Sequence, residues 1–261
     1  MTSKANNMTN TNNQAIADYA IRLADDSLTL GHRLSEWCSN GPFLEEDIAL
    51  INVALDYVGR ARMLYAYAAE TEGKSRTEDD ICYLRDARDY RNLLINELPK
   101  GDFAFTMVRQ FFVDTFNLLF YTELQNSSDD TLAATAGKAI KETTYHLRRS
   151  KDWVVRLGDG TEESHRRCQQ AIDELWDYVT ELFDMDELEN QLVGQGIAVN
   201  RAALRSQWQQ IVEDTVSEAT LTLPDHDIAI RGGRTGIHTE HLGYLLAELQ
   251  YVQRAYPGNT W

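Results

Sequence analysis

The spacing of apolar residues constrains the fold of this chain more than any other feature of its sequence. In long segments these residues recur at steps of three, four or seven, as at Leu23, Leu30, Leu34 and Trp37. That period places them along one face of an α-helix. The segments between the four prolines carry this period and not the alternation typical of strands. The sequence therefore predicts an all-α protein.

Glycine, proline and polar clusters divide the chain into helices. We expect long helices at 14–37, 44–70, 104–125 and 131–157, a shorter one through 81–97, and others at 162–183, 201–218 and 239–254. Two pairs of long helices joined by a long crossover are the layout of ferritin-like folds. The prediction is therefore a ferritin-like four-helix bundle with additional C-terminal helices. A helical-repeat protein is the alternative, although no period of about 30 to 50 residues recurs.

The Asn- and Thr-rich stretch 1–13 predicts a disordered tail, which leaves 14–261 as a single ferritin-like domain.

In the second expected helix the apolar stripe consists of Ile48, Ile51, Leu55, Val58 and Tyr65. Stripes of this kind ordinarily face the core.

Charge and composition exclude several classes of protein. With 41 acidic and 25 basic side chains, the formal net charge is −16, which repels nucleic acid and anionic lipid surfaces. No apolar stretch approaches the roughly 20 residues that cross a bilayer. Cys38, Cys82 and Cys168 lack the paired spacing of metal sites and suit buried thiols in a reducing compartment. We expect a cytoplasmic protein whose partners present a basic face.

A di-iron site in such a bundle needs one Glu from each of two helices and a Glu-x-x-His pair from each of the other two. Among the six histidines, only His165 has a glutamate three residues before it, Glu162. Glu162 follows Thr161, so its simpler role is in the first turn of a capped helix. His238, Glu240 and His241 offer two or three ligands, but a helix start after Gly236 explains them more simply. The sequence predicts no metal site.

Isolated polar residues do interrupt the expected bundle faces, and they could meet in the interior. They are Asn52, Asp56, Asp114, Glu142 and His146. Asp56 is followed at the third position by Gly59, and Glu142 by Tyr145, as in ligand pairs that kept the acid and lost the imidazole. We interpret these residues as a vestigial metal site.

Buried carboxylates without a metal must be protonated, paired or hydrogen-bonded. Arg22, Arg60 and Lys141 lie on helices that could deliver them to the interior, so we hypothesise that ion pairs fill the former site. The alternative is that these acids are solvated.

Five strings resemble the C subunit of phenylacetyl-CoA epoxidases, and together they extend from the first expected helix to the last. They are RLADDSLTLGHRLSEWC (22–38), DIALINVALDYVGRAR (47–62), AIKETTYHLRRSKDW (139–153), AIDELWDYVTELFD (171–184) and HTEHLGYLLAELQYVQR (238–254). The resemblance implies a non-catalytic structural subunit of the phenylacetyl-CoA ring 1,2-epoxidase of aerobic phenylacetate breakdown. It implies pairing with a di-iron catalytic A subunit, assembly with a B subunit, and a flavin and iron–sulfur reductase as electron donor. This chain itself shows no motif for those cofactors.

The resemblance also implies two stretches that approach the coenzyme A substrate. They are Asp89, Tyr90, Arg91, Asn92 and, more loosely matched, Asn190, Gln191, Leu192. Arg85, Arg88 and Arg91 could pair with phosphates, and Tyr90 could pack against adenine, although arginines among acids ordinarily form a surface ion-pair face. We interpret the glycine-rich cluster Arg231–Arg234 as partner surface, because it lacks the spacing of a phosphate-binding loop.

Two other functions compete with the structural role. The chain could be a di-iron oxygenase in its own right, which the shortage of ligands disfavours. It could also be a free-standing acyl-CoA binding bundle, which would act as a monomer without a related partner.

Overall fold

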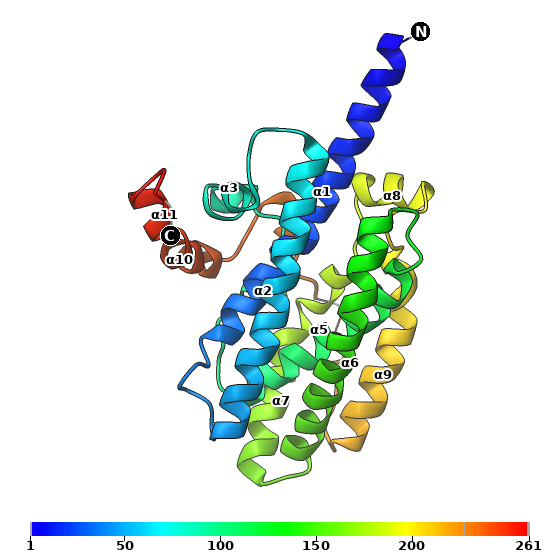
Figure 1. Ribbon diagram of the computed structural model, residues 1–261. Coiled ribbons are helices and arrows are strands. Elements are labelled where there is room, and N and C mark those ends of the chain that lie inside the picture. The colour runs from blue at the N-terminus through cyan, green and yellow to red at the C-terminus, as the bar shows by residue number, and fades with distance from the viewer. Residues whose placement is uncertain (1, 227, 260–261) are drawn as a thin grey trace.

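The computed structural model describes residues 2–226 and 228–259. Within these ranges the regular structure is helical and contains no strand, so the all-α prediction is confirmed (Figure 1). α1 (Thr2–Ser35) and α2 (Leu44–Glu72) form one long pair, and α5 (Phe103–Leu124) and α6 (Asp130–Gly158) form the other. The pairs meet through α2 and α6. The fold is the expected ferritin-like helical bundle. The structure differs from the prediction of a disordered tail at 1–13, because α1 begins at Thr2.

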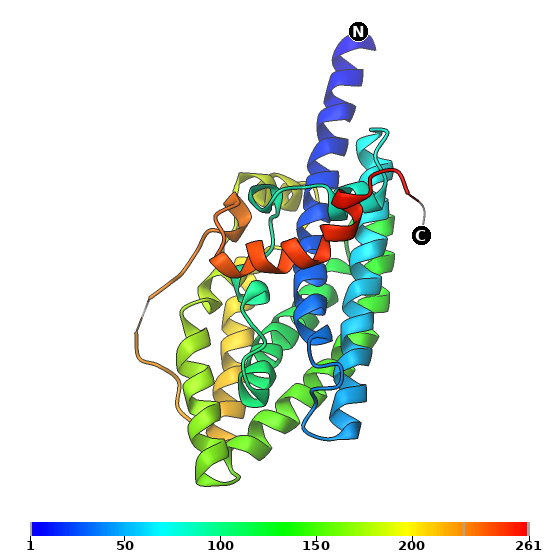
Figure 2. The ribbon, with the colours of Figure 1, turned by 90° about the vertical axis from the view of Figure 1, so that its left-hand side faces the viewer.

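The remaining helices cover the second pair and the crossover. α7 (Glu162–Trp176) and α9 (Arg205–Glu218) pack on α5 and α6. Between them lie η2 (Val179–Leu182), α8 (Glu187–Gly194) and η3 (Arg201–Leu204). The chain then returns through η4 (Gly233–Thr235) to α10 (Glu240–Leu249) and α11 (Tyr251–Ala255), which lie across the crossover in Figure 2.

The prediction of a single helix at 81–97 is wrong. The crossover instead consists of α3 (Glu78–Tyr83), η1 (Ala87–Asp89) and α4 (Leu94–Glu97), with extended residues between them. The helix breaks because its polar groups bind other elements: the backbone N–H of Arg91 donates to Asp25 and that of Leu93 donates to Asp26, both on α1. These tertiary hydrogen bonds replace helical ones, as a buried backbone requires.

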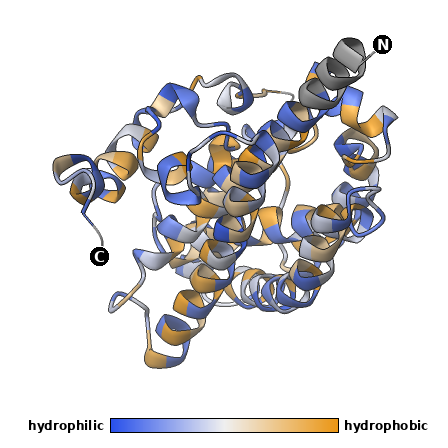
Figure 3. Ribbon diagram, turned by 45° about the horizontal axis from the view of Figure 1, so that its top comes forward, coloured by the Kyte–Doolittle hydropathy of each residue, from blue (hydrophilic) through white to orange (hydrophobic). Residues whose placement is uncertain are grey.

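The apolar stripe of α2 does not face the core, which corrects the sequence-based expectation. Ile48, Leu55 and Val58 are 50%, 62% and 40% exposed, whereas Tyr65 is buried. α2 is apolar on two sides, and its other side, which includes Ala54 and Tyr57, packs against α1. There the helices approach so closely that a Cβ at Gly31 would lie 3.1 Å from the Cβ of Tyr57. Figure 3 shows apolar residues along the outer helices as well as inside the bundle.

Candidate functional site

Six polar side chains from three helices meet between α2, α5 and α6. This interior polar cluster comprises Tyr57 and Arg60 of α2, Asp114 of α5, and Glu142, His146 and Ser150 of α6. Tyr57 connects its members: the hydroxyl donates to Asp114, the ring stacks on His146, and the guanidinium of Arg60 lies over the ring.

Asp114 is the most deeply placed acid of this cluster and is held by hydroxyl groups. The Tyr57 hydroxyl donates to its Oδ1 at 2.8 Å, and the Ser150 hydroxyl donates to its Oδ2 at 2.9 Å. Burial raises the pKa of the Asp114 carboxyl above its usual range, and the two hydrogen bonds and His146 offset this only in part. No cation contacts either oxygen directly among the described interactions.

Arg60 supplies a cation to this cluster. Its guanidinium is 1% exposed and donates to Glu142 Oε2 at 3.1 Å. It lies 5.0 Å from the ring centre of Tyr57 and 4.7 Å from that of Tyr121, within the range of cation–π attraction. A fixed positive charge of this kind repels a divalent metal from the same carboxylate.

The imidazole of His146 also has protein partners. Its Nε2 lies 3.0 Å from Asp56 Oδ2, and its ring stacks on Tyr57 with 5.5 Å between centres. Of the predicted polar residues, Asp56, Asp114, Glu142 and His146 therefore come together around Tyr57. Asn52 does not join them, because it is exposed.

The three predicted basic partners have different positions. Arg60 enters the interior, as hypothesised. Lys141 is exposed, and Arg22 instead pairs with Asp186 on the edge of α8 at 2.7 Å. Only one of the three thus supports the hypothesis of a filled metal site.

Neither of the short histidine motifs gathers ligands. The Thr161 side chain accepts from the Ser164 backbone and caps α7, while His165 Nδ1 lies 2.7 Å from the carbonyl oxygen of Gly158. His238 bridges Glu97 and the Tyr90 carbonyl, at 2.8 and 3.0 Å. Across the described part of the chain no group of three His, Cys, Asp or Glu side chains could hold a metal ion.

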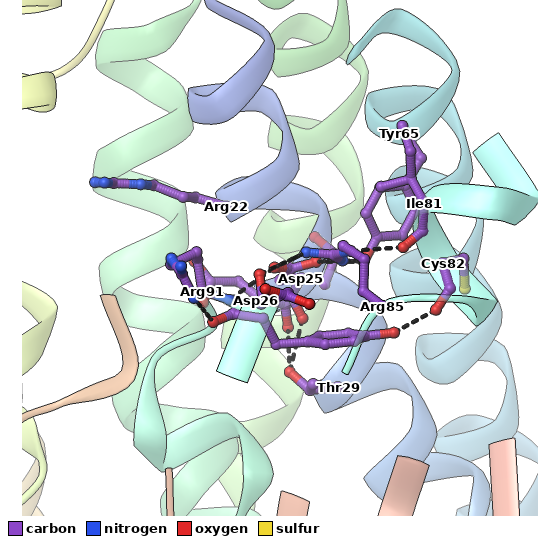
Figure 4. A network of polar contacts seen from close by, with 12 residues as sticks. Arg22, Asp25, Asp26, Thr29, Tyr65, Ile81, Cys82, Arg85 and Arg91 are labelled. Carbon is purple, nitrogen blue, oxygen red and sulfur yellow. Dashed lines mark hydrogen bonds and ion pairs between the residues drawn. The ribbon is translucent and has the colours of Figure 1, made fainter. Parts of the chain in front are cut away.

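A second network joins α1 to the crossover (Figure 4). Asp25, fully buried on α1, accepts from the Tyr65 hydroxyl at 2.5 Å and from the Arg91 backbone N–H at 2.8 Å, and pairs with Arg85. The guanidinium of Arg85 also lies 4.1 Å from the ring centre of Tyr90. Each donor satisfies part of a carboxylate that would otherwise be buried and unpaired.

The glycine-rich cluster Arg231–Arg234 belongs to this network, so its interpretation as partner surface is wrong for most of its length. Arg234 pairs with Asp26 at 2.7 Å and is largely buried. The N–H groups of Gly232 and Gly233 donate to Glu181 at 2.9 and 2.8 Å. A Cβ at Gly233 would overlap the Asn92 carbonyl oxygen, which explains the need for glycine. Only Arg231 is exposed, paired with Asp184.

The predicted coenzyme A contacts lie beside this network. Tyr90 and Asn92 are fully buried, with the Tyr90 hydroxyl donating to the Cys82 carbonyl and the Asn92 amide donating to Glu97. Arg91 donates to backbone carbonyls, and Asp89 accepts from the Asp86 N–H. The substrate role of this stretch stays a prediction.

The second predicted stretch borders the same part of α1. Asn190 and Gln191 are exposed on α8, whereas Leu192 is a core residue. α8 contacts α1 through the ion pair between Asp186 and Arg22. Arg22 lies three residues before Asp25, which accepts the hydrogen bond from the Arg91 N–H. A ligand contact at 190–192 also stays a prediction.

Sequence reasoning missed the long-range partners in this region. Glu97 binds His238, Glu181 binds Gly233, and Arg201 pairs with Glu189 at 2.7 Å in a fully buried contact. The first two pairings join residues far apart in sequence, and no local spacing reports them. The density of charged residues beside glycines at 231–236 was the available signal.

Fold and site together define a ferritin-like bundle whose interior holds an arginine–glutamate ion pair and a hydroxyl-bound acid. The comparisons identify the family. A model described as "Phenylacetic acid catabolic protein" matches residues 1–261, and the chain belongs to this family.

Two curated proteins from Escherichia coli (strain K12) are similar to the chain, and both are components of 1,2-phenylacetyl-CoA epoxidase. The chain is 47% identical to the C subunit of that enzyme over 243 residues, covering 93% of this chain and 98% of that protein. It is 26% identical to the A subunit over 197 residues, covering 74% of this chain and 63% of that protein. The resemblance predicted from the five strings is confirmed. No helix in the described part of the chain is long and apolar enough to span a bilayer.

Proposed function

We propose that this chain is a non-catalytic structural subunit of a multicomponent phenylacetyl-CoA ring 1,2-epoxidase, in which it pairs with the di-iron A subunit. The observation that carries the proposal is the Arg60–Glu142 ion pair, because a protein cation occupies the interior where oxygen chemistry would need metal cations. The A subunit of the E. coli enzyme shares 26% identity with the chain, as expected of two bundles derived from one ancestor.

The residues present do not fit a di-iron centre. Such a centre needs two Glu-x-x-His pairs, whereas the interior polar cluster offers one imidazole, that of His146, already bound to Asp56. Both oxygens of Asp114 already accept hydrogen bonds, from the hydroxyl groups of Tyr57 and Ser150. We infer that this chain carries out no reaction step and that the iron, flavin and iron–sulfur groups belong to other subunits.

The wider proposals follow from the family resemblance of the five strings. They are the B subunit and the reductase as further partners, a cytoplasmic location, and a single domain at 14–261. Contact with the coenzyme A moiety through Tyr90 would require a change at the crossover, because Arg85 and Tyr90 are bound to protein groups. Asn190 and Gln191 are already exposed on α8.

Reconstitution of the epoxidase tests the role. The reductase and the A and B subunits are assayed for epoxidation with wild-type chain, with Asp114→Asn, and without the chain. We expect wild-type activity with Asp114→Asn and a loss without the chain, because the chain performs no chemistry itself and supports the A subunit. Undiminished epoxidation without it would defeat the structural role. Loss of activity by a correctly assembled Asp114→Asn complex would favour a catalytic bundle.

The same preparation addresses the other candidate functions. A free-standing acyl-CoA binding bundle would bind phenylacetyl-CoA as an isolated monomer and would not bind the A subunit. Co-purification of the chain with the A subunit would contradict that function.

A further inference from the structure

Five apolar residues form an uncovered line along the outer side of α2. This outer seam consists of Leu44, Ile48, Ile51, Leu55 and Val58. Leu44 is 70% exposed and Leu55 62%, with Ile51 half-buried. Single exposed apolar residues are ordinary, but a contiguous line of them marks an interaction surface.

The spacing of the seam indicates what shape covers it. Its members follow one another at steps of four, three, four and three, which is the alternation that places knobs along the contact line between two helices. At 1.5 Å per residue the seam extends for about 21 Å. A partner helix lying along α2 would bury every member, whereas a loop or a small ligand would cover only part of it.

The described part of the chain leaves this side open. The opposite side of α2 packs on α1, and α6 contacts one flank (Figure 1). At the lower end the exposed Phe43 ring lies 5.9 Å from that of Trp153 and extends the apolar surface toward α6. Tyr145 of α6 is 43% exposed on the neighbouring helix.

The seam is also close to the interior polar cluster. Asp56 follows Leu55 in α2, is itself 40% exposed, and holds His146 at 3.0 Å. A helix seated on the seam would reduce the exposure of this pair to water. The surface is therefore continuous with the edge of the interior polar cluster.

We propose that the outer seam docks a helix of the A subunit, an inference that rests on the proposed function. A second copy of this chain suits the surface less well, because the seam begins beside Glu45, Glu46 and Asp47 and each copy carries a net charge of −16. Two copies would bring like charges together. The A subunit is a related chain over 197 residues, so it can offer a long bundle helix.

Variants of the seam test the proposal in the assembled complex. The chain is co-expressed with the tagged A subunit from its own organism, and dissociation on serial dilution is followed by mass photometry. Leu55→Lys and Ile48→Lys place a charge on the contact line, and we expect the complex to dissociate at a concentration about 100-fold higher than wild type. Tyr244→Lys, at a 69% exposed position of α10, is the matched control and should behave as wild type.

The outcomes separate the two proposals. The seam residues are exposed in the free chain, so the thermal midpoints of the variants should match wild type, and retained folding shows that any loss is at the interface. Wild-type dissociation by both seam variants would overturn the seam while leaving the proposed function intact. Dissociation of a self-associated form, with binding to the A subunit unchanged, would also overturn it. Failure of the wild-type chain to bind the A subunit would instead overturn the proposed function.

Discussion

At the scale of single residues, Asp114 shows how the interior manages an acid without a metal. Its two oxygens accept hydrogen bonds from Tyr57 and Ser150, and burial raises its carboxyl pKa above the ordinary value of 3.8. The native state therefore binds this proton more tightly than the unfolded chain does. By linkage, ionisation of Asp114 lowers the stability as the pH rises from about 3.8 through the raised value.

Asp114→Asn should therefore stabilise the protein at neutral pH. An amide keeps the acceptor for Tyr57 and removes the buried charge. The free energy of unfolding, measured by urea titration from pH 3.5 to 7.5, should match wild type at the acid end and exceed it increasingly as the pH rises. A constant difference across that range would contradict the raised pKa. A lower stability at neutral pH would show that the charge itself is needed.

Replacing either member of the Arg60–Glu142 pair should lower the free energy of unfolding, and the two losses should be unequal. Glu142→Gln leaves the guanidinium of Arg60 buried without an anion, which should cost about 3 kcal/mol. Arg60→Met keeps the apolar volume and leaves the partly exposed Glu142 beside Lys138, so it should cost only about 1 kcal/mol. The double variant should be more stable than Glu142→Gln alone. Equal costs for the single variants, measured by urea unfolding, would argue against a desolvated arginine.

At the scale of elements, η4 connects the C-terminal segment to the crossover through the close approach of Gly233 to Asn92. Gly233→Ala should lower stability by about 3 kcal/mol or more, because the added methyl group overlaps a buried carbonyl oxygen in a packed interior. Gly137→Ala is the matched control: nothing lies within 4 Å of its Cβ position on α6. That change should stabilise the helix by about 0.5–1 kcal/mol. Calorimetry of both variants would show opposite signs, and equal effects would contradict the close packing.

His238, which lies between η4 and α10, makes the stability of the C-terminal segment depend on pH. Burial alone lowers the pKa of its imidazole, but the hydrogen bond and charge of Glu97 and the Tyr90 carbonyl outweigh burial, so the pKa is raised. The contribution to stability is fully present below the unfolded value of 6.5 and is lost as the pH rises through the folded one.

His238→Gln should accordingly cost most in acid. The difference in unfolding free energy between wild type and His238→Gln should be largest below pH 6.5 and shrink as the pH rises through the folded pKa. An NMR titration of the imidazole would locate that folded pKa directly. A difference that grows with pH would show that His238 binds Glu97 as the neutral ring.

The helices show which elements local sequence can predict. α2, α5 and α6 begin and end close to the expected residues, because periodicity and capping side chains such as Asp102 and Asp129 act within one helical turn. The expected helix at 81–97 failed because Asp25 and Asp26 of α1 draw the backbone at Arg91 and Leu93 out of it. The expected polar cluster was recovered except for Asn52, whose position depends on the side of α2 that packs on α1.

At the scale of the whole molecule, two of the regions that hold buried charge are the interior polar cluster and the crossover network. The interior polar cluster joins α2, α5 and α6, while the crossover network joins α1 to segments that begin with Arg85 and end with His238. Both regions neutralise buried carboxylates with arginine or histidine. In both regions, therefore, protein cations pair with carboxylates at contacts between different elements.

That arrangement predicts that iron contributes nothing to the stability of this chain. A native-state ligand raises the unfolding free energy by an amount set by its concentration and affinity, so a tightly held di-iron centre would add about 4 kcal/mol at a thousandfold excess over its dissociation constant. Thermal midpoints of the purified chain should be the same with ferrous salt and with a chelator. The A subunit, treated identically in the assembled complex, is the positive control for metal loading. A chelator-sensitive midpoint, accompanied by two bound irons per chain, would mean that Arg60 can leave the interior and that the ion pair only replaces metal in the empty state.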